Sequence, residues 1–210
     1  MGTVCGVMER LQKITFPDGR TVGNWETERM METILGDLDL RGKTVLEVGC
    51  REGVGSLWLN QHGATVWAFD IDLDCRPPFD ETMEAFGVDL DFHLMDIESP
   101  NHEIFPIWPA SVVTMLGVIY HVPNPILALE NAWSATQEVL VIESEVLVDE
   151  KRSLMKFAGG EQNGNWDETC CWVPSPSCLR AMVDLLPGVH RVDDGISWMP
   201  SRRRVLRVWR

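Results

Sequence analysis

The residues with the clearest chemical potential follow a short apolar segment that is typical of a buried strand. Residues 45–48 (VLEV) run into residues 49–53 (GCREG) and then into a helical pattern. A glycine-containing turn between a strand and a helix lets a ligand approach the backbone closely. The spacing G-x-x-x-G-x-G differs from the dinucleotide fingerprint, because Arg51 and Val54 occupy its second and third glycine positions. A nicotinamide-dependent oxidoreductase is therefore disfavoured.

Acidic residues end the next two apolar segments. Asp70 lies 21 residues after Gly49, where a carboxylate can accept both ribose hydroxyls of an adenosine-bearing ligand. Asp96 follows the third segment and could accept from an adenine amino group. Each acid alone is commonly a turn or cap residue, but the repetition of the pattern at three strand ends favours a nucleoside site.

The elements that must position these residues alternate between strand and helix. Expected strands are 44–48, 65–69, 90–95, 111–116, 139–142, 189–192 and 203–209, and expected helices are 25–38, 54–61, 80–86, one opened by Asn124-Pro125 and one from Ser175-Pro176 to Leu186. This order predicts an α/β fold with a doubly wound, mostly parallel seven-stranded sheet and an antiparallel last strand. Ligands of such sheets bind at the carboxyl ends of the strands.

The chain is expected to form one domain, residues 1–210. Its first fourteen residues could form a short helix, so residues 1–40 are interpreted as an N-terminal helical cap. Residues 151–168 are polar and glycine-rich, which suggests a mobile lid within an insertion at 151–174. Trp25, Trp166 and Trp172 lie on segments able to cover a ligand.

Charge and cysteine usage exclude some classes of function. The net charge of the chain is −14. Residues 77–150 contain fourteen acidic residues and no lysine or arginine, whereas residues 201–210 contain five arginines and no acidic residue. The arginines fit a cationic edge strand or a basic handle for phosphate, but a pI near 4.7 argues against independent nucleic-acid binding. The six cysteines and five histidines show no metal-ligand spacing, so no metal is expected. Reduced thiols, no transmembrane segment and no secretion signal suggest a cytoplasmic protein.

The motifs LEVGCREG, FDID, MDIE and GVIYHVPNP together resemble class I S-adenosylmethionine-dependent methyltransferases. The resemblance implies a Rossmann-like methyltransferase fold and S-adenosylmethionine as cofactor. It implies that the methionine part of the cofactor binds at Glu47, Gly49, Cys50 and Gly53, and that the ribose binds at Asp70 and Ile71. The adenine would lie near Asp96 and Ile97. Gly117 and Val118, after the fourth strand, would flank the cofactor. The family commonly has glycine where Arg51 stands. Arg51 must avoid a left-handed conformation or bear its cost of about 1 kcal/mol.

Within that class, the chain is most similar to the branch related to tRNA wobble-uridine carboxymethyl transferases. The segments GVIYH, LVIESEVL and WVPS, and Trp25 near the entrance, carry this similarity in patches over residues 20–210. That branch holds a carboxylated cofactor with basic residues, where this chain has Asn24 and Val122. The resemblance therefore implies ordinary S-adenosylmethionine and a different substrate, with a small molecule favoured and tRNA less so.

Methyl transfer to oxygen or nitrogen also requires removal of a proton, for which histidine is suited. His121 is the candidate base, unless it packs or caps the following helix. Tyr120, the single tyrosine, could contact the substrate or pack in its loop, and Glu143 could orient His121 or be a solvated strand end. A non-catalytic cofactor-binding protein is the second interpretation, kept open by Arg51, and a tRNA modification enzyme is the third.

Overall fold

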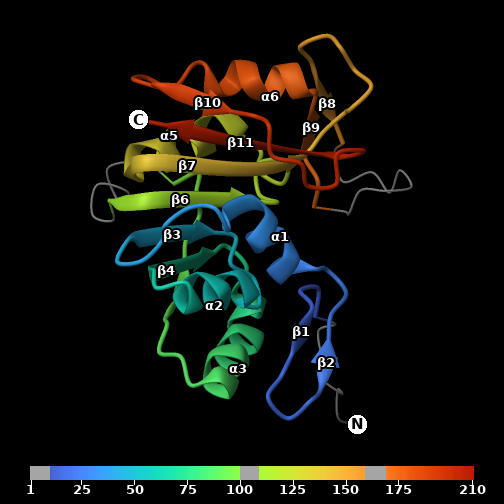
Figure 1. Cartoon of the computed structure of the whole chain (residues 1–210). Coiled ribbons are helices and arrows are strands. Elements are labelled where there is room, and N and C mark those ends of the chain that lie inside the picture. Colours follow the sequence, from blue (N-terminus) through green and yellow to red (C-terminus); the bar gives the residue numbers. More distant parts are fainter. Residues whose placement is uncertain (1–9, 100–108, 159–168) are drawn as a thin grey trace.

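The computed structural model describes residues 10–99, 109–158 and 169–210, and its main feature is a seven-stranded sheet (Figure 1). The strand order is β10-β11-β7-β6-β3-β4-β5. The strands are β3 (Thr44–Val48), β4 (Thr65–Asp70), β5 (Phe92–Leu94), β6 (Ala110–Leu116), β7 (Thr136–Glu145), β10 (Arg191–Asp193) and β11 (Arg203–Trp209). All pairs from β5 to β7 are parallel, and β11 is antiparallel to both neighbours. This confirms the predicted doubly wound sheet with its antiparallel last strand.

Helices cover both faces of this sheet. The helices α1 (Thr27–Leu35), α2 (Val54–Gln61) and α3 (Arg76–Phe86) contribute to one core, and α5 (Pro125–Ala135) and α6 (Pro176–Val183) contribute to the other. A short 3-10 helix, η1 (Leu73–Cys75), precedes α3. In the central strand, Val45 belongs to the first core and Leu46 to the second. Because both faces of the sheet are covered, the middle of the central strand β3 has consecutive apolar residues rather than an alternating pattern.

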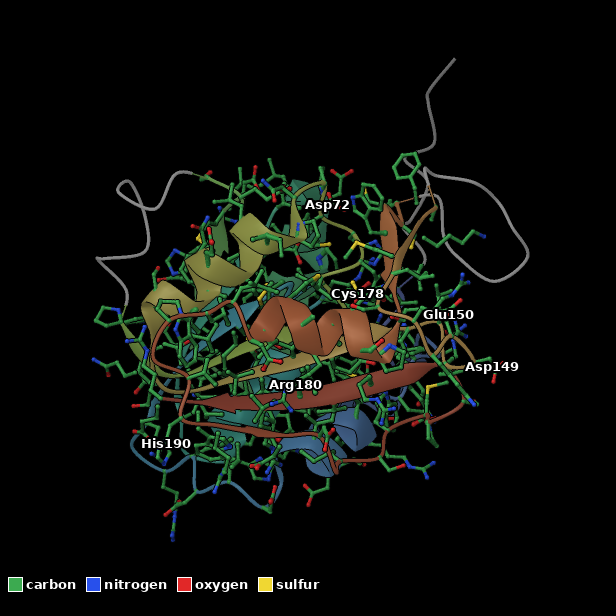
Figure 2. The ribbon with its side chains drawn as sticks, turned by 90° about the horizontal axis from the view of Figure 1, so that it is seen from above. Asp72, Asp149, Glu150, Cys178, Arg180 and His190 are labelled. Carbon is green, nitrogen blue, oxygen red and sulfur yellow. The ribbon has the colours of Figure 1, made fainter. Side chains whose placement is uncertain are left out.

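The candidate residues lie at one edge of the sheet, where β3, β4, β6 and β7 end. Asp149 and Glu150, just beyond β7, mark this edge at the right of Figure 2. His190 precedes β10 and marks the opposite edge at the left. No helix among the described residues is long and apolar enough to cross a membrane.

The N-terminal part differs from the expected helical cap. Residues 1–9 lie outside the described residues, and residues 10–13 are not helical but lie beside Trp25, with Lys13 N donating to Trp25 O at 2.8 Å. A small hairpin follows, formed by β1 (Ile14–Thr15) and β2 (Thr21–Val22), and α1 begins only at Thr27. Pairing with the chain around Trp25 therefore overrides the weak helical pattern of this segment.

The expected lid is only partly described. Strand β8 (Met155–Phe157) pairs antiparallel with β9 (Trp172–Pro174), and the backbone N–H groups of Cys171 and Trp172 donate to Tyr120 O at 2.8 and 3.1 Å. Residues 159–168, including Trp166, lie outside the described residues. The lid role of this insertion stays a prediction.

Helix α5 shows how a local sequence signal fixes an element. Asn124 Oδ1 accepts a hydrogen bond from Leu127 N at 3.2 Å, and Pro125 occupies the first helical turn. This cap satisfies one of the N–H groups that a helix leaves without an internal partner.

We predict that Asn124→Ala lowers the free energy of unfolding by about 1 kcal/mol, because it removes this cap. Glu130→Ala, an exposed change on the same helix, is the control and should shift stability by less than about 0.5 kcal/mol. Urea unfolding followed by circular dichroism measures both. Equal stabilities for the two variants would contradict the capping role.

Candidate functional site

The loops after β3 and β6 meet at Gly49. The N–H of Gly49 donates to Phe69 O at 2.8 Å, and its φ is 82°. A Cβ at this position would lie 2.6 Å from Val118 Cγ2. Glycine is therefore required both by backbone conformation and by the close approach of the β6 loop. The structure thus brings together Gly49 and Val118, two of the residues that the sequence analysis expected at the cofactor site.

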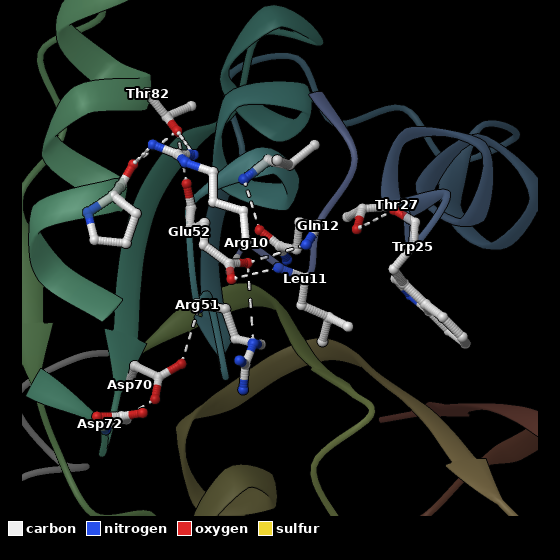
Figure 3. A network of polar contacts seen from close by, with 12 residues as sticks. Arg10, Leu11, Gln12, Trp25, Thr27, Arg51, Glu52, Asp70, Asp72 and Thr82 are labelled. Carbon is white, nitrogen blue, oxygen red and sulfur yellow. Dashed lines mark hydrogen bonds and ion pairs between the residues drawn. The ribbon is translucent and has the colours of Figure 1, made fainter. Parts of the chain in front are cut away.

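Asp70, the last residue of β4, joins the loops after β3 and β4. Its Oδ2 accepts from Arg51 N at 2.9 Å, and its Oδ1 accepts from Asp72 N at 2.9 Å (Figure 3). Only 7% of Asp70 is exposed. Arg51 does adopt the left-handed conformation, with φ 48°. Hydrogen bonds to charged groups contribute about 1.5–3 kcal/mol, which offsets the cost of that conformation.

Glu47 lies beneath α2, inside the protein. It is 6% exposed and accepts a short hydrogen bond from the Ser56 hydroxyl. A Cβ on Gly55 would lie 2.1 Å from Glu47 Oε1, so the helix passes directly over the carboxyl group. Burial raises the pKa of Glu47 to about 7, and the charge of Asp70 adds to the rise, whereas the Ser56 hydrogen bond opposes it.

The other predicted cofactor residues differ in what they present. The thiol of Cys50 is fully buried, and burial raises its pKa, so only its backbone can face a ligand. Gly53 has φ 83°, and a Cβ there would lie 2.7 Å from the Phe79 ring. Ile71, by contrast, is 66% exposed directly after the Asp70 carboxylate.

Asp96 and Ile97 follow β5 and face different environments. Asp96 is half-buried and accepts from Glu98 N at 2.8 Å, in a turn that precedes undescribed residues. Ile97 is buried in the second core, while its carbonyl accepts from Asn131 Nδ2 at 2.6 Å. The backbone at this position is thereby fixed next to the strand ends.

A buried polar cluster lies below Gly117, which has φ 74°. Arg203 Nη1 donates to both oxygens of Glu143 at 3.0 and 3.1 Å, and Arg203 Nη2 donates to Tyr120 Oη at 3.1 Å. A Cβ on Gly117 would lie 3.5 Å from the Tyr120 hydroxyl and 3.9 Å from Glu143 Oε2. The cluster therefore supports the turn after β6 from below.

This cluster corrects the interpretation of Glu143. Glu143 is not a solvated strand end, because β7 continues to Glu145 and Glu143 is 0% exposed. Its carboxylate accepts from Arg203, whereas the Nδ1 of His121 lies 2.8 Å from Thr169 Oγ1. Burial raises the pKa of Glu143, and the charge of Arg203 opposes that rise. For Arg203, burial would lower the pKa, but the carboxylates of Glu143 and Glu145 raise it overall, so the guanidinium is charged.

Sequence reasoning missed Arg203 because it counted this residue with the C-terminal arginines. Residue 203 pairs with Glu145 in the antiparallel β7–β11 register, and its guanidinium lies 3.4 Å from Glu145 and 4.8 Å from the centre of the Trp25 ring. Acids at 143 and 145 opposite an arginine-bearing strand were the available signal. The register needed to use that signal comes only with the fold.

The proposed basic handle is largely engaged inside the protein. Arg202 forms a two-point ion pair with Glu145, Arg207 pairs with Asp37, and Arg210 stacks 4.7 Å above the Trp133 ring. Together with Arg203, four of the five arginines therefore have intramolecular roles. The interpretation as a phosphate-binding surface loses most of its support.

His121, the residue after Tyr120, contacts the segment that precedes β9. Its Nδ1 is 2.8 Å from Thr169 Oγ1, and its carbonyl accepts from the Cys171 thiol at 3.2 Å. The ring centres of Tyr120 and His121 are 4.2 Å apart. Trp172 lies nearby, with Nε1 donating to Pro123 O at 3.0 Å. The segment before β9 thus holds the candidate base in place.

A separate cavity of about 430 Å³ lies between the N-terminal hairpin and α2. Lys13, Glu26, Leu57 and Trp58 are among the residues that line it. It includes none of the predicted cofactor or catalytic residues. The convergence of strand-end loops, rather than this cavity, therefore defines the candidate active site.

We predict that Glu47→Gln flattens the pH dependence of stability. Since the folded-state pKa of about 7 exceeds the unfolded value of 4.5, the native state binds this proton more tightly. The free energy of unfolding should therefore fall as pH rises from about 4.5 to 7, and the variant should avoid this loss of a few kcal/mol. Chemical unfolding at several pH values measures the difference. Glu84→Gln, exposed on α3, is the control, and parallel profiles for Glu47→Gln and wild type would contradict the prediction.

Comparisons with known proteins agree with this geometry. Residues 25–185 match the family model described as a methyltransferase domain. No curated protein matches the chain. Among solved structures, the chain is similar to magnesium protoporphyrin IX methyltransferase from Synechocystis PCC 6803 with bound SAM (TM-score 0.61, 18% identity, 88% of this chain and 79% of that one). It is also similar to the N-terminal domain of EvdMO1 with SAH bound (0.63, 16%, 87% and 78%) and to a SAM-dependent methyltransferase from Aquifex aeolicus (0.59, 14%, 88% and 89%).

These similarities confirm the Rossmann-like fold expected from the strand order. The family match covers most of the chain, from Trp25 near the polar cluster to the end of α6. It includes every predicted cofactor-binding and catalytic residue. The chain belongs to the methyltransferase-domain family.

Proposed function

We propose that this protein transfers a methyl group from S-adenosylmethionine to a small molecule. The observation that carries the proposal is the arrangement at the end of β4. There the Asp70 carboxylate is followed directly by the exposed side chain of Ile71, and Asp70 accepts from Arg51 N in the loop that begins at Gly49. A carboxylate suits the two hydroxyls of a ribose, and an exposed aliphatic side chain suits the face of a purine. The family membership supports the same donor.

The residues present fit this donor. The backbone around Gly49, Cys50 and Gly53 would hold its methionine part next to Glu47, and the turn after β5 at Asp96 and Ile97 would hold its adenine. Gly117 and Val118 would flank it from the β6 loop. Arg51 does not disrupt this arrangement, because its left-handed backbone donates to Asp70.

The chemistry required of the protein is limited. The bound cofactor supplies a methyl group on a positively charged sulfur, which reacts by in-line displacement. The protein orients the acceptor and excludes water. In this proposal His121, which contacts Thr169, accepts the acceptor's proton, and Tyr120, which contacts Arg203, binds the acceptor or the cofactor. Glu143 acts through Arg203 rather than at the reacting atoms.

The donor is proposed to be ordinary S-adenosylmethionine rather than the carboxylated form used by the related wobble-uridine branch. The guanidinium of Arg203 lies near Tyr120 but is already neutralised by Glu143 and Glu145. Asn24 and Val122 supply no charge at the positions where that branch has basic residues. The small-molecule acceptor is favoured over tRNA because four C-terminal arginines are engaged internally.

We predict that Asp70→Ala weakens binding of S-adenosylhomocysteine by about 1.5–3 kcal/mol, because two ribose hydrogen bonds to a charged group are lost. Stability should also fall, since Asp70 accepts from Arg51 and Asp72 in the ligand-free protein. Calorimetric titration well below the melting temperature separates the two effects. Asp74→Ala, an exposed acid in the same loop, is the control, and wild-type affinity of Asp70→Ala would remove Asp70 from the site.

We predict that tRNA binds no more tightly than non-specific levels at physiological salt, with a Kd of about 10⁻⁴–10⁻⁶ M. Fluorescence anisotropy over a salt series measures this. Arg204→Glu tests the arginine that is half-exposed on β11 without disturbing the buried ion pairs. Submicromolar, salt-sensitive binding that this change abolishes would favour the tRNA-modifying alternative.

A further inference from the structure

Glu52 is a buried acidic residue inside the glycine-containing loop and is none of the residues expected to bind the cofactor. It is 1% exposed. Its Oε1 accepts from Leu11 N at 3.0 Å, and its Oε2 accepts from Gln12 N at 3.3 Å (Figure 3). A buried carboxylate is costly unless hydrogen-bond donors or a positive charge compensate it. Here the main donors come from a segment about forty residues away in the sequence.

The same segment completes helix α2. The N-cap residue of α2 is Gly53, which has no side chain to cap the helix, and Gln12 Oε1 instead accepts from Val54 N at 3.1 Å. The Glu52 carboxylate thus accepts from the backbone of residues 11 and 12, and the Gln12 side chain accepts from the backbone of Val54, two residues after Glu52. We call residues 10–12 the strap.

Arg10 anchors the other end of the strap on α3. Its guanidinium donates to Thr82 Oγ1 at 2.9 Å and to Pro78 O at 2.7 Å. Thr82 in turn donates to Glu52 O at 2.8 Å. The backbone and the side chain of Glu52 are therefore both held by one closed set of hydrogen bonds.

One residue, Arg51, connects this hydrogen-bond network to Asp70, the carboxylate proposed to bind the ribose. Arg51, directly before Glu52, is left-handed and donates through its N–H to Asp70. Its Nε also lies 3.9 Å from Glu52 Oε2. Glu52 and Asp70 are thus linked through the backbone of Arg51, which has a left-handed φ and donates to Asp70.

We propose that Glu52 is a positioning residue of the cofactor site, which sets the glycine-containing loop by docking the strap. The proposal rests on the cofactor site proposed above. By linkage, a strap that improves cofactor binding must itself be docked more firmly when the cofactor is bound. Strap docking and cofactor affinity are then coupled, although no strap residue needs to touch the cofactor.

The test compares Glu52→Gln with Glu84→Gln. The glutamine at 52 keeps the shape of the side chain but removes its charge and places an amide donor against backbone donors. Glu84 is exposed on α3 and takes no part in the hydrogen bonds that dock the strap. Calorimetry with S-adenosylhomocysteine should show at least tenfold weaker binding for Glu52→Gln and less than twofold change for Glu84→Gln.

Hydrogen exchange of the strap supplies a readout that a purely structural role would not move. In the wild type, S-adenosylhomocysteine should increase protection of the Leu11 and Gln12 amides, and in Glu52→Gln this increase should be lost. If Glu52→Gln does not fold, Gln12→Ala removes the α2 cap alone and should weaken binding at least threefold.

Two outcomes would overturn the proposal. A lower melting temperature with wild-type affinity, and no ligand effect on strap exchange, would make Glu52 a structural residue only. In that case Asp70→Ala would still weaken binding, so the proposed function would stand. Unchanged affinity in Glu52→Gln, Gln12→Ala and Asp70→Ala together would overturn both the positioning role and the cofactor site.

Discussion

The candidate site depends on the carboxylate of Asp70, which connects two loops by hydrogen bonds. One oxygen accepts from the loop after β3 and the other accepts from the loop after β4, so two strand ends are fixed by a single side chain. Parallel strands place their carboxyl ends at one edge but do not by themselves fix the loops that leave them. Here the Asp70 carboxylate fixes both loops by accepting from Arg51 N and Asp72 N.

Buried acidic side chains lie around Asp70, and each has a different kind of hydrogen-bond partner. Glu47 has a hydroxyl partner, and its pKa of about 7 leaves it largely protonated below neutral pH. Glu52 is compensated by backbone N–H groups of the strap, and Glu143 by the guanidinium of Arg203. Buried groups of this kind cost stability when one partner is removed. Their concentration at one edge is typical of a functional site rather than of packing alone.

The order of the elements could be predicted well because hydrophobic patterns and caps are local. Residues 44–48 and 54–61 match β3 and α2 at both ends, and Asn124 caps α5 as its type suggests. Strand β7 is longer than expected because residues 143–145 are buried by pairing with β11, although two of them are acidic. Glu143 pairs with Arg203, sixty positions away, so from the sequence alone the acidic residue suggests that the strand ends there.

The same limit explains what was missed at the site. The glycine and acid positions could be found because each follows a strand directly. Arg203 and Glu52 could not be found, since their partners come from β7 and from the strap and depend on tertiary contacts. Residues 1–14 were expected to be helical, but among the described ones residues 10–13 are not helical and instead contact Trp25 and Glu52.

The most direct test of this account is a crystal structure of the protein with S-adenosylhomocysteine bound. We expect both ribose hydroxyls within about 3 Å of the Asp70 oxygens, a normal hydrogen-bond distance, with the adenine next to Ile71. The homocysteine part should lie between the Gly49 turn and Gly117. Ligand density elsewhere, for example in the cavity beside Trp58, with Asp70 bound only to Arg51 and Asp72, would contradict the assignment of this edge of the sheet as the methyl-donor site.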